Sequence, residues 1–217
     1  MRANLGIKAV KLDLSRIDEI QNFVEQSAIE IGGVTVLILN AAVTGIREDH
    51  DYSSKVVFEA QKRLVESASG FLRKTNGRIV FLTSGQAWNP VEGHEHYGKA
   101  KREVEDFLRE FSRKPENENT SVFLVNPGHV DTRMHQEAML YGKGAIRKIS
   151  IKAKEDGLLR NPKTIGKIIS KMSLAGKKFN PKTQEYDMPI ANNEIVFISD
   201  ENIKFEESAE KLNQVVR

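Results

Sequence analysis

The sequence predicts an α/β fold in which helices cover a parallel sheet. Short apolar runs, typical of buried strands, alternate with longer stretches whose apolar residues recur at helical spacing. This alternation is characteristic of parallel strands joined by crossover helices. The chain has 217 residues, of which 39% are hydrophobic and 29% charged, and this size and composition suit one folded unit. We therefore expect a single α/β domain over residues 1–217.

The first expected elements are a short strand and a helix. The apolar run at residues 7–12 predicts the strand. Helical spacing of apolar residues predicts the helix that follows, with Ser15 as its cap and Gly32 at its end. The apolar face of this helix would comprise Ile17, Ile20, Val24, Ala28 and Ile31.

The rest of the chain continues the alternation. Strands are expected at residues 34–39, 77–83, 122–125 and 194–198, and helices at residues 55–74, 95–113 and 161–174. The turn Thr75-Asn76-Gly77 ends the first of these helices. The helix at residues 95–113 would bury Ala100, Val104, Phe107, Leu108 and Phe111. All the expected strands, including the one at residues 7–12, would lie in one parallel sheet.

Tyr97 and Lys101 lie four residues apart in the helix expected at residues 95–113. Positions with this spacing share a helix face, so the Lys101 ammonium would lie beside the Tyr97 phenol and favour its ionised form. Tyr97 is therefore a candidate general acid or base near neutral pH. Ser84, at the end of the strand expected at residues 77–83, would offer its hydroxyl to the same substrate oxygen. A Tyr-x-x-x-Lys pair alone is common on solvated helices, so the surrounding motifs decide whether this pair is catalytic or incidental.

Four short motifs, in this order along the chain, resemble those of the short-chain dehydrogenase/reductase family. They are Asp13-Leu14, Asn40-Ala41-Ala42, Ser84 with Tyr97 and Lys101, and Asn126-Pro127-Gly128 followed by Val130 and Thr132. Ala42 stands where the family usually has glycine. The resemblance implies a Rossmann-like parallel sheet with flanking helices.

The resemblance also implies a chemistry and a cofactor. Family members reduce ketones or aldehydes, or oxidise alcohols, with NAD or NADP. In this chemistry Ser84 binds the carbonyl oxygen, Tyr97 is the general acid or base, and Lys101 holds the cofactor ribose and lowers the pKa of Tyr97. The implied cofactor-binding residues are Asp13, Leu14, Asn40, Ala41, Tyr97, Lys101, Pro127, Gly128, Val130 and Thr132. Residues 134–160 correspond to the segment that covers the substrate.

The sequence departs from the family pattern near its beginning. Residues 1–30 contain no Gly-x-x-x-Gly-x-Gly turn, which in the family brings the cofactor pyrophosphate to a helix N-terminus. We therefore expect an N-terminally truncated fold that lacks the family's first two strands, and weak binding of NAD or NADP by the chain as given. In the family's strand order, those two strands separate the strands expected here at residues 7–12 and 34–39, so a sheet edge would be exposed. The family's Asn in the next helix has no counterpart either.

Two other interpretations stay open. The chain would be a truncated, catalytically inactive pseudoenzyme that acts as a binding or interaction module, or a non-redox protein in which the Ser, Tyr and Lys spacing is incidental. An in-frame glycine-rich segment upstream of Met1 would favour the enzyme over the module.

The composition and charge of the chain indicate which partners and which cellular compartment to expect. The formal net charge is only +3, and the basic stretch at residues 143–154 lacks the aromatic residues that stack on bases, so we expect no nucleic-acid partner. The chain has no cysteine and no His, Asp and Glu cluster at metal-ligand spacing, so no metal site is expected. The sequence shows neither a signal peptide nor an apolar run long enough for a bilayer, which predicts a cytoplasmic protein without membrane contact. The expected partner is a small carbonyl or alcohol, and the family implies a possible homo-oligomer through helices 55–74 and 95–113.

Three side chains near the motifs have two interpretations each. His94 and His129 would contact the substrate or, more commonly for such residues, be exposed or structural. Trp88 would line the substrate pocket or pack on a neighbouring helix.

Overall fold

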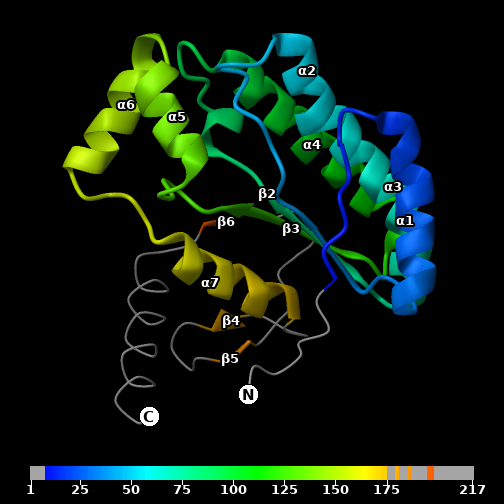
Figure 1. The fold of residues 1–217 in the computed structure, drawn as a ribbon. Coiled ribbons are helices and arrows are strands. Elements are labelled where there is room, and N and C mark those ends of the chain that lie inside the picture. The colour runs from blue at the N-terminus through cyan, green and yellow to red at the C-terminus, as the bar shows by residue number, and fades with distance from the viewer. Residues whose placement is uncertain (1–7, 175–178, 181–184, 187–194, 198–217) are drawn as a thin grey trace.

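A parallel sheet forms the middle layer of the molecule, with helices on both of its faces (Figure 1). The computed structural model describes residues 8–174, 179–180, 185–186 and 195–197. Its main sheet has four parallel strands in the order β1-β2-β3-β6, and β4 and β5 form a separate antiparallel pair.

The elements follow one another along the chain with short connections. They are α1 (Ile17–Ile31), β1 (Val36–Leu39), α2 (His50–Ser54), the π-helical turn η1 (Lys55–Glu59), α3 (Ala60–Lys74), β2 (Arg78–Leu82), the 3₁₀ turn η2 (Gly85–Ala87), α4 (Glu95–Arg113), the 3₁₀ turn η3 (Pro115–Asn117), β3 (Ser121–Asn126), α5 (Arg133–Tyr141), α6 (Gly144–Glu155), α7 (Pro162–Leu174), β4 (Phe179–Asn180), β5 (Glu185–Tyr186) and β6 (Ile195–Phe197).

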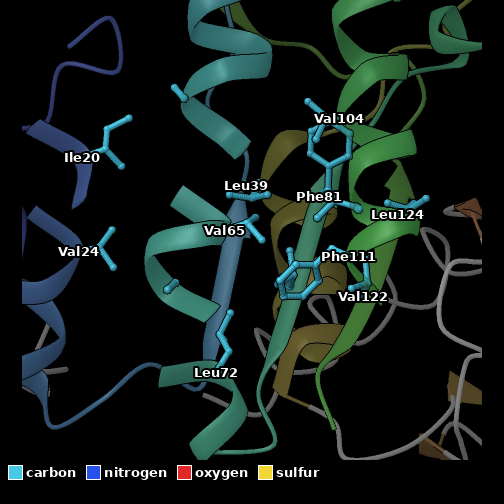
Figure 2. Close-up of a cluster of buried hydrophobic side chains, with 14 residues drawn as sticks. Ile20, Val24, Leu39, Val65, Leu72, Phe81, Val104, Phe111, Val122 and Leu124 are labelled. Atoms are coloured by element: carbon cyan, nitrogen blue, oxygen red, sulfur yellow. The ribbon is translucent and has the colours of Figure 1, made fainter. Parts of the chain in front are cut away.

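Side chains of β2 alternate between two apolar clusters, one on each face of the sheet. Ile79 and Phe81 face α3 and α4 in the larger cluster, which also contains the buried side of α1 (Figure 2). Val80 and Leu82 face the opposite way, where they pack with residues of α7. A strand buried on both faces must be apolar at every position, which explains the unbroken apolar run in the sequence.

The parallel register brings the carboxyl ends of the strands to one edge. Leu39 pairs with Phe81, and Leu82 pairs with Val125, so the segments after β1, β2 and β3 leave the sheet side by side. Helices α5 and α6 lie beyond this edge (Figure 1). Ligands of open α/β sheets bind at such an edge.

The predicted α/β class, with a parallel sheet and flanking helices, is confirmed. The helix predicted at residues 95–113 has the bounds of α4, and the helix predicted at residues 161–174 begins one residue later, as α7. Residues 195–197 of the last predicted strand form β6, whereas residues 194 and 198 lie outside the described residues.

The strand predicted at residues 7–12 is wrong over its described part, residues 8–12, which form no strand. Val10 in this segment is exposed, and β1 is an edge strand of the described sheet, with Ile38 45% exposed. Residues 8–12 pair with none of the described strands, although one edge of β1 has no strand partner in the described part of the chain.

Two local predictions also differ from the structure. Ser15 does not cap α1: the N-cap residue is Arg16, and the Ser15 hydroxyl donates to Asp13 at 2.7 Å. The helix predicted from residue 55 begins earlier, at His50, because the Asp49 carboxylate accepts from the Tyr52 amide at 2.7 Å and caps it. No helix in the described part of the chain is both long and apolar enough to cross a bilayer.

Candidate active site

A cavity of about 820 Å³ lies at the carboxyl edge of the sheet. Its walls come from the segments after β1, β2 and β3, from the first turns of α4 and α7, and from α5 and α6. The predicted site residues that line it are Asn40, Ala41, Ser84, Tyr97, Lys101, Pro127, Gly128, Val130 and Thr132. The structure therefore brings most of the predicted site together in one space.

Asp13 and Leu14 are the two predicted cofactor contacts that are not among the cavity-lining residues. Asp13 is exposed, and its carboxylate accepts from the amide and the hydroxyl of Ser15, which lowers its pKa. Leu14 packs against the cluster between α1 and the sheet. Their part in cofactor binding stays a prediction.

Ser84 and Tyr97 reach the cavity because α4 approaches the loop after β2 very closely. Ser84 is the N-cap residue of η2, and its hydroxyl accepts from the Gln86 amide at 3.2 Å. Gly98 makes the approach possible: a Cβ at this position would lie 2.5 Å from the Gln86 carbonyl oxygen. Any larger residue beside Tyr97 would push the loop away from the helix.

Lys101 is 2% exposed, and its ammonium donates to the Leu82 carbonyl at 2.6 Å. The Lys101 Nζ lies 4.6 Å from the centre of the Phe81 ring and 5.6 Å from that of the Tyr97 ring. Burial lowers the pKa of Lys101 to about 7, and the negative charge of Glu105 opposes this shift. Near neutral pH the side chain is therefore poised between its charged and neutral forms.

The pKa of Tyr97 differs from the prediction. Burial raises the pKa of its phenol well above the ordinary value, so the prediction that Lys101 lowers this pKa is wrong for the structure as it stands. Desolvation of the phenolate raises this pKa, and Lys101 is itself only partly charged near neutral pH. The phenol is protonated at physiological pH and can donate a proton.

His94 is buried against Tyr97 and lines the cavity. The two rings are stacked, with centroids 4.5 Å apart and planes inclined by 5°. His94 Nδ1 lies 2.8 Å from Gln86 Oε1, and burial lowers the pKa of His94 to about 4, so the ring is neutral at physiological pH. Of the two interpretations of His94, the structure favours a pocket residue.

The opposite wall comes from the segment after β3 and from α5 and α6. The His135 ring nitrogen Nε2 lies 3.0 Å from the Ser150 carbonyl and joins these two helices. His129 meets the His135 ring edge-on and lines the cavity. Burial, followed by the nearby His135 and Arg160, lowers the pKa of His129.

Trp88 does not line the cavity. It is 43% exposed, and the Arg102 guanidinium of α4 lies 3.7 Å above its ring. The second interpretation of Trp88, packing on a neighbouring helix, is the one the structure supports.

Replacing Lys101 with Met is expected to stabilise the fold by about 2 kcal/mol at pH 6. A pKa lowered from 10.5 to about 7 means that the folded protein holds a costly buried ammonium below pH 7. The Met loses the hydrogen bond to the Leu82 carbonyl, which offsets part of the gain. The sign follows from proton binding: the unfolded chain binds the extra proton, so the stability of the wild type rises with pH between about 7 and 10.5, and the advantage of the variant fades over the same range.

Urea unfolding at several pH values measures this difference. Lys99, on the same helix with a side chain 77% exposed, provides the control, and Lys99→Met should change stability little at any pH. A Lys101→Met protein that is less stable than the wild type at pH 6 would show that the buried ammonium is not a net cost.

Comparisons with known proteins agree with this geometry. A model of the short chain dehydrogenase family matches residues 2–140. The chain is 25% identical over 142 residues to 11-beta-hydroxysteroid dehydrogenase A of Sesamum indicum, covering 60% of this chain and 39% of that protein. It is 30% identical over 149 residues to the uncharacterised oxidoreductase YjdA of Bacillus subtilis, covering 61% of this chain and 57% of that protein. The chain thus spans between two fifths and three fifths of the length of these relatives.

The fold has solved counterparts too. A crystal structure of a short-chain dehydrogenase/reductase from Saccharomyces cerevisiae superposes with a TM-score of 0.71 at 20% identity, covering 89% of this chain and 77% of that one. At this identity the likeness concerns the fold alone.

Proposed function

Because the chain belongs to the short-chain dehydrogenase family, we propose that it is the catalytic part of an NAD- or NADP-dependent oxidoreductase that reduces a ketone or aldehyde, with Tyr97 as the proton donor. The observation that carries the proposal is the meeting of Ser84, Tyr97 and Lys101 at one cavity beside Asn40. Tyr97 and Lys101 come from α4, and Ser84 and Asn40 from the segments after β2 and β1.

The cavity residues suit the nicotinamide end of such a cofactor. The Lys101 ammonium has donors beyond the one that binds Leu82, and the Asn40 amide offers both a donor and an acceptor, which are the groups that ribose hydroxyls need. Gly128, at φ +71°, takes a conformation that favours glycine and keeps the turn after β3 narrow. Asp13 is not part of this cavity, so the fit does not extend to the adenine end.

The residues can divide the chemistry of carbonyl reduction among them. When bound, the nicotinamide cofactor supplies the hydride. The Ser84 hydroxyl donates to the carbonyl oxygen and orients it, and the protonated Tyr97 phenol gives its proton to the same oxygen as the alcohol forms. The Lys101 ammonium stabilises the phenolate that results. The protonated phenol is the form that carbonyl reduction starts from, whereas alcohol oxidation would start from the phenolate, so the resting protonation state suits reduction near neutral pH.

The wall formed by α5 and α6 favours an uncharged substrate. Met134, Ala138, Ile146 and Ile149 give this wall an apolar character, and no carboxylate is among the lining residues of the cavity in the described chain. We propose that residues 134–160 cover a largely apolar ketone or aldehyde. Pairing of two copies through α3 and α4 is a further part of the proposal.

One observation favours a second candidate, a binding module without catalytic activity. The pKa of Tyr97 is raised and that of Lys101 lowered, and an active site that needs a phenolate beside an ammonium requires the opposite directions. Turnover separates the two candidates, because the module would bind a nicotinamide compound without oxidising it.

Binding of the reduced cofactor by the purified protein is expected to be weak, well above micromolar Kd. The described cavity residues offer groups that would suit the nicotinamide ribose, and each helix-terminus or charge-assisted phosphate contact that is not made costs about 1–3 kcal/mol. Reduced nicotinamide mononucleotide, which lacks the adenylate half, should therefore bind nearly as well as NADH or NADPH.

Titration followed by cofactor fluorescence measures all three ligands, and Lys101→Met should weaken each of them. Micromolar binding of the whole dinucleotide, but not of the mononucleotide, would contradict the expectation. It would place the phosphates on other residues, such as the basic stretch at residues 143–154.

A further inference from the structure

Glu105 is a buried carboxylate one helical turn beyond Lys101 on α4. It is 0% exposed and lies on the same face of the helix as Lys101, since the two residues are four positions apart. Burying a carboxylate is costly unless other groups stabilise its charge. We therefore expect polar or positively charged neighbours that stabilise the Glu105 carboxylate.

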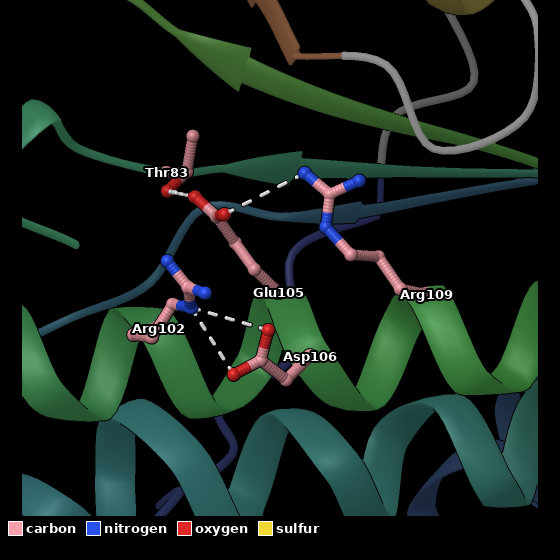
Figure 3. A network of polar contacts seen from close by, with 5 residues as sticks. All are labelled: Thr83, Arg102, Glu105, Asp106 and Arg109. Carbon is pink, nitrogen blue, oxygen red and sulfur yellow. Dashed lines mark hydrogen bonds and ion pairs between the residues drawn. The ribbon is translucent and has the colours of Figure 1, made fainter. Parts of the chain in front are cut away.

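The Lys101 and Glu105 side chains both form hydrogen bonds with residues at the end of β2. The Leu82 carbonyl accepts from the Lys101 ammonium, and the hydroxyl of the next residue, Thr83, donates to the Glu105 carboxylate (Figure 3). The Thr83 amide in turn donates to the Val125 carbonyl of β3 at 2.9 Å, which anchors it in the sheet. Ser84 follows directly and lines the cavity. Three consecutive residues therefore tie the lysine, the glutamate and the substrate side of the site to one strand end.

The charges around this pair come from α4 itself. Burial raises the pKa of Glu105, and the hydrogen bond from Thr83 is the largest of the contributions that oppose this shift. Arg109, whose Nη2 lies 3.9 Å from Glu105 Oε2, and more weakly Arg102 also favour the charged carboxylate. Arg102 also pairs with the exposed Asp106 on the outer side of the helix (Figure 3). The loop after β2 contributes Trp88, and β2 contributes the Phe81 ring and uncharged polar groups. Glu105 is the negative charge that acts on the Lys101 ammonium.

We infer that Glu105 is a positioning residue, which keeps Lys101 in its cationic form and, through Thr83, holds α4 in register with the end of β2. The inference rests on the proposed function only for its catalytic consequence, because Lys101 must be cationic to stabilise the Tyr97 phenolate. The buried carboxylate opposes the loss of that proton, which burial favours.

Glu105→Gln removes the charge and keeps the size and the ability to accept from Thr83. We expect the titration midpoint of Lys101 to fall by about one pH unit, as is usual when a buried group loses an opposite charge. Lysine labelled with ¹³C at Cε reports the midpoint by NMR, and the Lys101 signal is assigned by its loss in Lys101→Met. If the protein turns over, the basic limb of its pH profile should move to lower pH by the same amount.

Asp106→Asn is the matched control, because it removes an exposed carboxylate from the adjacent position of the same helix. Screening by solvent should leave the Lys101 midpoint unchanged in this variant. An unchanged midpoint in a folded Glu105→Gln protein would overturn the inference. Should Glu105→Gln not fold, Glu105→Met removes the charge with an apolar side chain of similar length: a lowered Lys101 midpoint supports the inference, and a wild-type midpoint overturns it.

The NMR titration needs neither substrate nor cofactor. A protein without turnover whose Lys101 midpoint shifts as expected would contradict the proposed function and leave the role of Glu105 intact. An active protein whose Lys101 midpoint does not move in Glu105→Gln would support the proposed function and overturn the role of Glu105.

Discussion

Replacing Tyr97 with Phe is expected to lower kcat for carbonyl reduction by about 10²–10⁴-fold, the usual contribution of a positioned general acid. The substitution removes one oxygen and keeps the ring, which stacks on His94. The fold and the affinity for the reduced cofactor should therefore change little. Steady-state reduction of a panel of ketones and aldehydes, followed by loss of cofactor absorbance, measures the effect.

Tyr141→Phe is the control for loss of a phenol hydroxyl. Tyr141 lies on α5, is exposed, and has the Arg47 guanidinium 4.9 Å above its ring. Its substitution should leave kcat close to that of the wild type. A Tyr97→Phe protein that reduces carbonyls at the wild-type rate would remove Tyr97 from the mechanism.

The second large effect is expected from Phe81, which is 1% exposed at the centre of the larger apolar cluster. Phe81→Ala should lower the free energy of unfolding by about 3–5 kcal/mol, because the lost ring leaves a cavity that the strands and α4 cannot close. The ring also lies next to the Lys101 ammonium, so the site should lose order with the core. Urea unfolding followed by circular dichroism measures the loss.

Phe81→Leu keeps most of the apolar volume and should cost only about 1–2 kcal/mol. Equal destabilisation by both substitutions would indicate that the aromatic contact with Lys101, and not the filled volume, stabilises this position.

The spacing of apolar residues was sufficient to predict α4 and the buried strands. The bounds of α4 follow from apolar residues at helical spacing, and Ala100, Val104, Leu108 and Phe111 are buried as that spacing predicts. The apolar runs of β2 and β3 reflect a sheet that is covered on both faces, whereas Ile38 of the edge strand β1 is 45% exposed.

The strand predicted at residues 7–12 failed because pairing depends on a neighbour that local sequence does not reveal. The π-helical turn at Lys55–Glu59, in which Val56 and Val57 are buried, was not predicted either. Tertiary context overrides local preference at such positions.

Site residues were easier to locate than their electrostatics. The order of the motifs placed Ser84, Tyr97 and Lys101 at one edge of the sheet, since carboxyl ends of parallel strands meet there. The direction of the Tyr97 pKa shift depends on burial, which the four-residue spacing to Lys101 does not show. Glu105 was missed for the same reason, although its position four residues after Lys101, between the apolar Val104 and Leu108, was a usable signal.

The most direct test of the proposed function follows the hydride itself. The purified protein is incubated with a carbonyl substrate and saturating NADPH or NADH that carries deuterium at the transferable C4 position, and mass spectrometry measures deuterium in the product alcohol. We predict deuterium on the carbinol carbon with the wild type and with Tyr141→Phe, and little with Tyr97→Phe. Cofactor binding without any transfer of deuterium to the carbonyl compounds would contradict the account and identify a binding module.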